Sequence, residues 1–219
     1  MGKISAVVFD VDGVLLDSLE PHLQICRDKN KEYNLGLKIP SIDKFRQMVG
    51  KGTKISPMVY FFKAVGFPSE YADKATAQYN EIFMKEYSPK PFPDIDDMLS
   101  KLTQARLKLG IVTSNVRANI DSALGYSMRF FYETAILTKD NIENESKSEA
   151  LISVVKELNV DINEVIYIGD QLADFLAAKE SKIQFLGVSY GWGIFKKDKQ
   201  FPMVDNIEDI AKYILVRKN

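Results

Sequence analysis

The sequence VVFDVDGVLLDS, residues 7–18, joins a strand pattern to a pair of carboxylates. Its apolar, β-branched start is typical of a fully buried strand, which we predict over residues 4–9. The strand ends at Asp10, and Asp12 and Gly13 follow directly. Two neighbouring carboxylates repel each other, so this arrangement requires a cation, a proton or another compensating feature.

Taken alone, the Asp-x-Asp-Gly pattern also fits an ordinary turn, because Asp-Gly is a common turn dipeptide. A calcium-binding loop does not fit. Val14 and Leu16 occupy positions where such a loop has ligands, and Pro21 stands where the final Glu belongs.

Strand and helix patterns alternate from about residue 93 onward. The predicted helices are residues 146–158, which open with a Ser146–Glu149 capping box, and the segment after Asn206. Further strands are predicted at residues 107–113, 134–137, 164–170 and 184–190. This alternation predicts an α/β fold with a doubly wound, Rossmann-like parallel sheet.

Residues 17–87 differ, because they show helical patterns only, with breaks near 34–41, 49–53 and 66–69. The proline-rich residues 88–94 are interpreted as the return linker. We therefore expect an α/β core formed by residues 1–16 and 88–219, with residues 17–87 inserted as a helical domain.

The composition limits the classes of function. The 219 residues are 46% apolar, and 29 Lys and Arg residues balance 30 Asp and Glu residues. A generic nucleic-acid binder usually has a basic excess, which is missing here. The chain has one cysteine, Cys26, and neither a membrane-spanning apolar run nor a signal-peptide pattern. We expect a cytoplasmic protein without membrane or nucleic-acid partners.

Ligands of open α/β sheets bind beyond the carboxyl ends of the strands. Polar residues that follow the predicted strands, or begin a helix beside them, are Asp10, Asp12, Thr113, Ser114, Asn115, Lys147, Asp170 and Asp174. Carboxylate oxygens bind Mg²⁺, whereas hydroxyl, backbone N–H and ammonium groups bind a phosphate dianion. The set predicts a site for a hard cation together with a phosphate.

Several of these residues have simpler explanations when each is taken singly. Thr113 and Asp170 are typical helix N-caps, and Asp174 is an acid favoured in a first helical turn. Lys147 is harder to explain, because a cation in the first turn opposes the helix dipole unless an anion faces it. The occurrence of all of them at strand or helix ends favours a common site.

Four segments resemble the motifs of the haloacid dehalogenase superfamily of hydrolases, in the subfamily with a helical cap and close to its phosphoglycolate phosphatase-like members. They are FDVDGVLLDS, IVTSN, SKSEAL and VIYIGDQLADFLAA. The resemblance covers nearly the whole chain and implies a catalytic core with a cap at residues 17–87. Gln171, Ser148 and Asp94 depart from the residues that are usual in the family.

The resemblance implies that Asp10 is the nucleophile, which forms an aspartyl-phosphate, and that Asp12 is the general acid and base. Thr113 and Lys147 would hold the phosphate oxygens. Ser114, through its backbone amide, and Asn115 complete the implied phosphate site.

Mg²⁺ is the implied cofactor, with the Asp10 carboxylate, the Asp12 backbone carbonyl and Asp170 as its ligands. Asp174 would either hold a metal-bound water or orient Lys147.

The cap would close over this site, with hinges near residues 17–19 and 88–93. Basic and hydroxyl side chains around a Gly-rich break in the cap either select the substrate or form a solvated basic loop. They are Arg46, Lys51, Thr53 and Lys54. We expect His22 and Trp192 to be packing or surface residues.

The leading hypothesis is a Mg²⁺-dependent phosphatase that acts on a small organic phosphomonoester and is a monomer or homodimer. A sugar phosphomutase shares every core residue and is the alternative. Dehalogenase chemistry does not need the proton-transfer group Asp12. A non-catalytic binding protein on the same fold is disfavoured by the intact set of polar residues.

Overall fold

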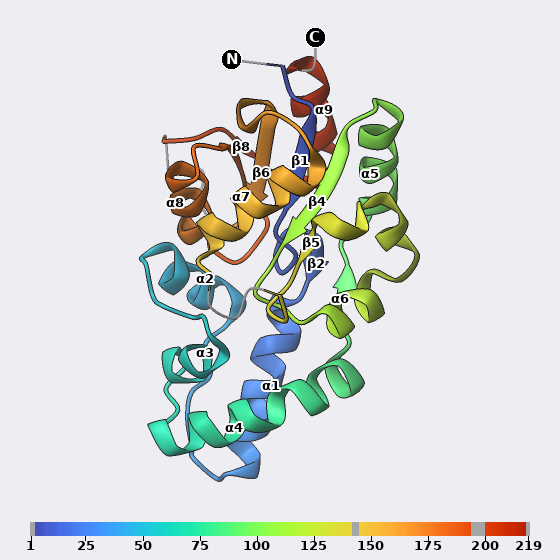
Figure 1. Ribbon diagram of the computed structural model, residues 1–219. Coiled ribbons are helices and arrows are strands. Elements are labelled where there is room, and N and C mark those ends of the chain that lie inside the picture. Colours follow the sequence, from blue (N-terminus) through green and yellow to red (C-terminus); the bar gives the residue numbers. More distant parts are fainter. Residues whose placement is uncertain (1–2, 142–144, 194–199, 218–219) are drawn as a thin grey trace.

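A six-stranded parallel sheet forms the centre of the computed structural model (Figure 1), which describes residues 3–141, 145–193 and 200–217. The strand order is β5-β4-β1-β6-β7-β8, and each neighbouring pair runs parallel. The first strand therefore lies inside the sheet, with later strands added on both sides of it. This is the doubly wound α/β fold predicted from the sequence.

The strands of the sheet are β1 (Ala6–Phe9), β4 (Lys108–Val112), β5 (Ile136–Leu137), β6 (Val165–Gly169), β7 (Gln184–Val188) and β8 (Met203–Val204). Each of the five predicted strands is present, with its ends within a few residues of the prediction. β8 was not predicted, and the equally short β5 was predicted as part of residues 134–137.

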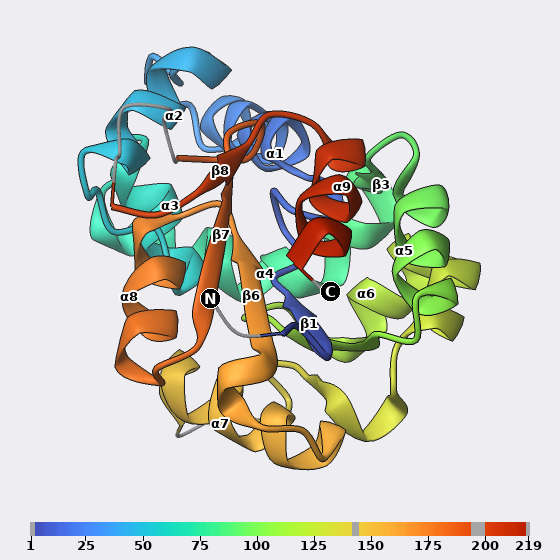
Figure 2. The same cartoon turned by 90° about the horizontal axis from the view of Figure 1, so that it is seen from above.

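Helices cover both faces of the sheet, as the view from above shows (Figure 2). Val7 and Phe9 of β1 pack into one apolar cluster with α5 and α9, whereas Ala6 and Val8 pack into a second cluster with α7 and α8. Both faces of the strand are buried, which explains its continuous apolar sequence. The helices of this body are α5 (Ile95–Gln104), α6 (Arg117–Leu124), α7 (Lys147–Leu158), α8 (Leu172–Glu180) and α9 (Ile207–Arg217).

A second, all-helical body lies below the carboxyl edge of the sheet in Figure 1 and has its own apolar cluster. It contains α1 (Leu19–Glu32), α2 (Ile42–Gly50), α3 (Met58–Ala64), α4 (Ser69–Ile82) and a π-helix (Phe83–Tyr87). The helices are interrupted where the sequence predicted breaks. We call this body the cap and propose residues 17–87 as its extent. Across the described ranges, no helix has both the length and the apolar character needed to cross a bilayer.

The two chain segments that connect core and cap pair with each other. β2 (Leu16–Asp17) and β3 (Lys90–Pro91) form a short antiparallel ribbon, in which Leu16 lies opposite Pro91. The Phe92 N–H extends the pairing by donating to the Leu15 carbonyl at 3.0 Å. The two predicted hinge segments therefore lie side by side.

The predicted capping box at the start of α7 is confirmed. The Ser146 N–H donates to Glu149 Oε2 at 2.7 Å, and the Glu149 N–H donates to Ser146 Oγ at 3.3 Å. This reciprocal cap fixes Lys147 as the first residue of the helix. Ser148, one of the departures from the family pattern, is buried, and its hydroxyl lies 2.9 Å from Ser146 Oγ.

Asp94, a second departure, stands where the family commonly has Gly. Its φ of 63° is in the left-handed region, which Gly adopts freely and which Asp tolerates better than most other residues. The substitution therefore preserves the backbone turn that leads into α5.

Candidate active site

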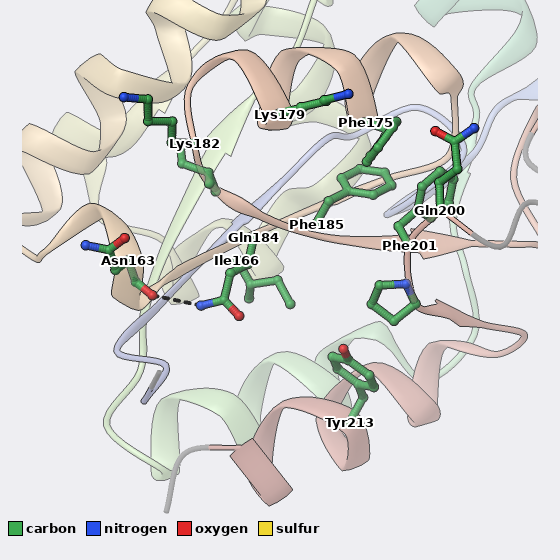
Figure 3. Close-up of a pocket in the computed structure, with 12 residues that line it drawn as sticks. Asn163, Ile166, Phe175, Lys179, Lys182, Gln184, Phe185, Gln200, Phe201 and Tyr213 are labelled. Carbon is green, nitrogen blue, oxygen red and sulfur yellow. Dashed lines mark hydrogen bonds between the residues drawn. The ribbon is translucent and has the colours of Figure 1, made fainter. Parts of the chain in front are cut away.

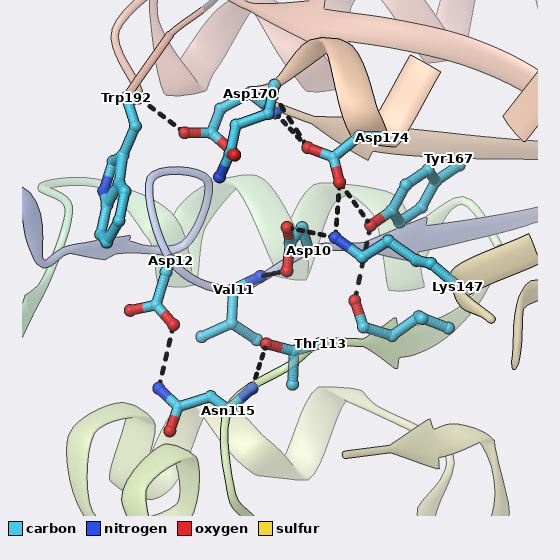
Figure 4. A network of polar contacts seen from close by, with 12 residues as sticks. Asp10, Val11, Asp12, Thr113, Asn115, Lys147, Tyr167, Asp170, Asp174 and Trp192 are labelled. Carbon is cyan, nitrogen blue, oxygen red and sulfur yellow. Dashed lines mark hydrogen bonds and ion pairs between the residues drawn. The ribbon is translucent and has the colours of Figure 1, made fainter. Parts of the chain in front are cut away.

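Three strand ends meet at the carboxyl edge of the sheet and carry the polar residues of a candidate active site (Figure 4). Asp10 follows β1, Thr113 follows β4 and Asp170 follows β6. These ends are adjacent because β1 lies between β4 and β6 and pairs with both. Asp10 and Thr113 are buried, and Asp170 is completely inaccessible to solvent.

Lys147 reaches into this site from the first turn of α7. Its ammonium lies 2.8 Å from Asp10 Oδ2 and 2.5 Å from Asp174 Oδ1. The Tyr167 hydroxyl donates to the same Asp174 oxygen at 3.4 Å. Facing carboxylates therefore offset the unfavourable position of a cation at the start of a helix, as the sequence argument requires.

Asp10, Asp170 and Asp174 form a buried acidic cluster in which one oxygen of each lies within 4.8 Å of the others. Asp170 Oδ1 is buried and accepts no hydrogen bond from the described residues. A buried carboxylate oxygen without a donor is costly unless a cation or proton satisfies it. This donor set fits a hard divalent cation, which prefers oxygen ligands.

Asp174 is engaged through both of its oxygens. Oδ1 binds Lys147, while Oδ2 accepts the backbone N–H groups of Asp170 at 3.1 Å and of Gln171 at 2.9 Å. These contacts favour the orienting role for Asp174. Its role as a metal ligand stays a prediction. Gln171, the third departure from the family pattern, contributes through its backbone, which any residue type supplies.

Burial dominates the electrostatics of the cluster. It raises the pKa of Asp10 from 3.8 to about 7, a shift that Lys147 opposes and Asp174 reinforces. Burial, with Asp174 and Asp10 nearby, also raises the pKa of Asp170 well above 3.8. Burial alone would lower the pKa of Lys147, but Asp10 and Asp174 reverse this and raise it. Without a metal, negative charge on Asp10 and Asp170 is therefore unfavourable.

This charge predicts a pH-dependent effect of Asp10→Asn on the stability of the metal-free protein. The raised folded-state pKa of Asp10 means that its stabilising contribution is complete below the unfolded pKa of 3.8 and lost as pH rises through about 7. Asn resembles the protonated acid. We therefore subtract the melting temperature of the wild type from that of the variant, both measured in EDTA. This difference should be about 2–4 °C or more larger at pH 8 than at pH 4.

Thermal unfolding followed by circular dichroism measures this difference. The matched control is Asp43→Asn, since Asp43 is an exposed acid of α2. A melting-temperature difference for Asp10→Asn that is equal at both pH values would contradict the prediction.

The Asp12 carboxylate is held by Asn115, which follows the neighbouring strand β4. Asn115 Nδ2 donates to Asp12 Oδ2 at 2.9 Å, and the Asn115 N–H donates to Thr113 Oγ1 at 3.2 Å. Asp12 Oδ1 is buried and has no hydrogen-bond partner among the described residues. Asn115 therefore orients the Asp12 carboxylate. The sequence analysis placed Asn115 at the site but did not foresee this contact. The neighbouring Ser114 side chain is exposed.

The cap residues proposed as substrate contacts have different surroundings. Lys51 is exposed and takes no part in the polar contacts of the acidic cluster described above. Lys54 is also exposed, with its ammonium 4.0 Å from the centre of the Tyr60 ring. Arg46 reaches out of α2 to the core and donates to the Ser189 carbonyl. The substrate-binding role of Lys51 stays a prediction.

Trp192 packs in an apolar cluster, as the sequence analysis allowed, but its contact with the acidic cluster was not foreseen. It is buried, and its backbone N–H donates to Asp170 Oδ2 at 2.6 Å. A Cβ on Gly13 would lie 2.1 Å from the same oxygen and 2.7 Å from Trp192 Cδ1, so the turn after Asp12 needs Gly for space as well as for its φ of 80°. Gly191 and Gly193, which flank Trp192 after a predicted strand, were the available signal in the sequence, because such glycines often mark a close approach of the backbone to other groups.

A cavity of about 490 Å³ lies away from the acidic cluster (Figure 3). Asn163 and Gln184, near the amino ends of β6 and β7, form one side of it, and Gln184 Nε2 donates to the Asn163 backbone carbonyl at 2.7 Å. Phe185 and Phe201 line its interior. The cavity contains none of the predicted site residues.

A parallel sheet with a helical insertion after its first strand, and an aspartate cluster at the carboxyl edge of the sheet, is the arrangement of catalytic core and cap that the sequence analysis expects. The sequence profile of the haloacid dehalogenase-like hydrolases matches residues 7–188, and the chain belongs to this family.

Several curated relatives of the chain are phosphatases. The chain is 26% identical over 215 residues to the phosphoglycolate phosphatase of Pseudomonas fluorescens (strain Pf0-1). The matched region covers 95% of this chain and 78% of the Pseudomonas fluorescens enzyme. The chain is also 25% identical over 198 residues to the N-acetylmuramic acid 6-phosphate phosphatase of Pseudomonas putida. This match covers 87% of this chain and 85% of that enzyme. The chain is accordingly a phosphoric monoester hydrolase of this family.

A solved structure supports the fold. A haloacid dehalogenase-like family protein from Streptococcus pneumoniae superimposes with a TM-score of 0.75 at 23% identity, over 96% of this chain and 98% of that one. At this identity the similarity establishes the architecture of core and cap.

Proposed function

We propose that the protein hydrolyses a small organic phosphomonoester through an aspartyl-phosphate on Asp10, with Mg²⁺ as its cofactor. The observation that carries this proposal is the contact of Asp10 with Lys147 beside a buried carboxylate, Asp170, whose Oδ1 lacks a donor among the described residues. These groups would supply the nucleophile, a cation for the phosphate oxygens and a ligand atom for the metal.

The Asp10 carboxylate, the Asp12 backbone carbonyl and Asp170 would hold the Mg²⁺. When bound, it would neutralise negative charge on these carboxylates and on the phosphoryl oxygens. The raised pKa values of Asp10 and Asp170 support this assignment, because burial makes ionisation of both groups unfavourable even though Lys147 opposes the shift.

In the first step, an Asp10 oxygen attacks phosphorus, and the bond from phosphorus to the ester oxygen breaks. Asp12 gives its proton to the departing alkoxide, so an alcohol leaves and Asp10 carries the phosphoryl group. Asn115 keeps the Asp12 carboxylate in place. Lys147, Thr113 and the Ser114 amide would bind the non-bridging oxygens.

In the second step, Asp12 takes a proton from water as the water oxygen attacks the phosphorus of the aspartyl-phosphate. The acyl-phosphate bond breaks, inorganic phosphate leaves, and Asp10 returns to a carboxylate. Asp12 is then protonated for the next cycle, so one residue serves both steps.

Small phosphate esters form the proposed substrate class, since the relatives named above act on phosphoglycolate and on a sugar phosphate. A cytoplasmic location, with the single cysteine kept reduced, also remains our proposal.

A panel of phosphorylated metabolites, assayed for inorganic phosphate with Mg²⁺ and with EDTA, tests the proposal. We expect release from at least one two- to six-carbon phosphomonoester, and loss of release in EDTA. Isomerisation of a sugar phosphate without phosphate release would identify a phosphomutase instead. Equal rates in Mg²⁺ and EDTA would contradict the proposed cofactor.

A further inference from the structure

The turn after β7 fills the space between Asp170 and the cap. It contains Gly191, Trp192 and Gly193. A Cβ on Gly191 would lie 2.3 Å from Asp170 Cβ, and a Cβ on Gly193 would lie 2.3 Å from Val49 Cγ1 in α2. Non-bonded atoms do not approach this closely, so each glycine is required for contact, one with the core and the other with the cap.

The backbone of Trp192 determines how the Asp170 carboxylate is used. Its N–H donates to Oδ2 at 2.6 Å, which leaves Oδ1 as the buried oxygen with no donor among the described residues. A short hydrogen bond to a charged acceptor is among the stronger ones in proteins and fixes the orientation of the carboxylate. The position of the Trp192 backbone therefore sets which oxygen remains for a cation.

The side chain of Trp192 packs against the cap, although its backbone is part of the core. It is 6% exposed and is part of the apolar cluster of the cap. The indole lies edge-on to His22, with ring centres 4.8 Å apart, and to Phe61, with ring centres 5.6 Å apart. Phe45 follows at 6.4 Å. Edge-to-face pairs of this kind add specific attraction beyond apolar burial.

We propose that Trp192 is a positioning residue that couples closure of the cap to the orientation of the Asp170 carboxylate. The proposal rests on the proposed Mg²⁺ site and deepens it. When the indole is seated among the cap aromatics, the adjoining amide holds Asp170 Oδ2 and presents Oδ1. Because such coupling is reciprocal, a cation bound at Asp170 favours the closed cap as much as the closed cap favours the cation.

The chain provides its own reporter, because Trp192 is its only tryptophan. We expect Mg²⁺ alone, without substrate, to reduce the quenching of Trp192 fluorescence by acrylamide about twofold or more. The reason is that a bound cation shifts the population toward the state in which the indole is buried.

Two neighbouring phenylalanines of α3 provide a matched pair of variants. Both are buried in the cap, but Phe61 packs on Trp192, whereas Phe62 packs on Phe67 with ring centres 5.2 Å apart. Isothermal titration of Mg²⁺ should show a Kd about fivefold weaker in Phe61→Leu. The Kd of Phe62→Leu should stay within about twofold of wild type, since its contacts do not include the indole.

Variants of Trp192 itself complete the test. Trp192→Ala keeps the amide but removes the indole, and should weaken Mg²⁺ binding by about tenfold or more, because every aromatic contact with the cap is lost. Trp192→Phe keeps an aromatic ring and should restore most of the affinity. Circular dichroism verifies that each variant is folded.

Equal Mg²⁺ affinities of Phe61→Leu and Phe62→Leu, or acrylamide quenching that Mg²⁺ does not change, would overturn the coupling. The proposed function can fail separately. A wild-type protein that hydrolyses no phosphate ester, yet shows the Mg²⁺-dependent fluorescence change and the Phe61–Phe62 difference, would support the coupling and reject the proposed function.

Discussion

Asp10→Asn abolishes phosphate release, with an expected loss of about 10⁴-fold or more. In the proposed mechanism the carboxylate supplies the attacking oxygen, and the amide that replaces it is a very poor nucleophile at the same position. Asp10 also contacts Lys147 at 2.8 Å, but loss of this contact is a smaller effect, since Lys147 keeps Asp174 at 2.5 Å. The loss should therefore be in kcat, with the phosphate-binding groups left in place.

Steady-state kinetics on the best substrate of the metabolite panel measures the loss. Asp43→Asn makes the same chemical change at an exposed position of α2 and should keep wild-type kinetics. If Asp10→Asn retained more than about a hundredth of the wild-type kcat, the nucleophile would have to be another group.

Asp12→Asn should lower turnover by about 10²–10⁴-fold, the usual contribution of a positioned acid and base. Unlike Asp10→Asn, this variant still contains the proposed nucleophile, Asp10. With an aryl phosphate, whose leaving group departs without a proton, the first step persists while the second lacks its base. The phosphoenzyme should therefore accumulate.

Acid quenching followed by intact-mass spectrometry detects the accumulated adduct, and peptide mapping should locate it on Asp10. Asn115→Ala provides a graded comparison, because it leaves the Asp12 carboxylate in place but removes the amide that holds it at 2.9 Å. Its loss of turnover should be smaller than that of Asp12→Asn. Absence of any adduct in Asp12→Asn, with full loss of turnover, would argue against two separate roles for Asp10 and Asp12.

The sequence predicted the sheet, and the proximity of Asp10, Lys147 and Asp170 at its edge, where the signal was local. β1 is a continuous apolar run because both of its faces are buried, and such runs are visible in the sequence. Lys147 was recognisable because a cation is unfavourable in a first helical turn, and the capping box fixed where that turn begins.

The remaining features depend on contacts between distant segments. The pairing of β2 with β3 joins Leu16 to Pro91, and neither two-residue segment has a strand pattern of its own. The bond from Asn115 to Asp12 spans two strand ends. Trp192 resembled an ordinary packing residue, because its sequence neighbours do not reveal that its amide meets Asp170 while its ring enters the cap.

The β2–β3 ribbon has a consequence for how such enzymes diversify. The polypeptide leaves the core and returns to it at adjacent points, so the cap is an inserted unit whose two chain connections lie side by side. A different cap could be grafted at Asp17 and Lys90 without displacing the strand ends that carry Asp10 and Asp170. Transplanting the corresponding segment of a related phosphatase would then exchange the recognised ester while conserving the phosphorus chemistry.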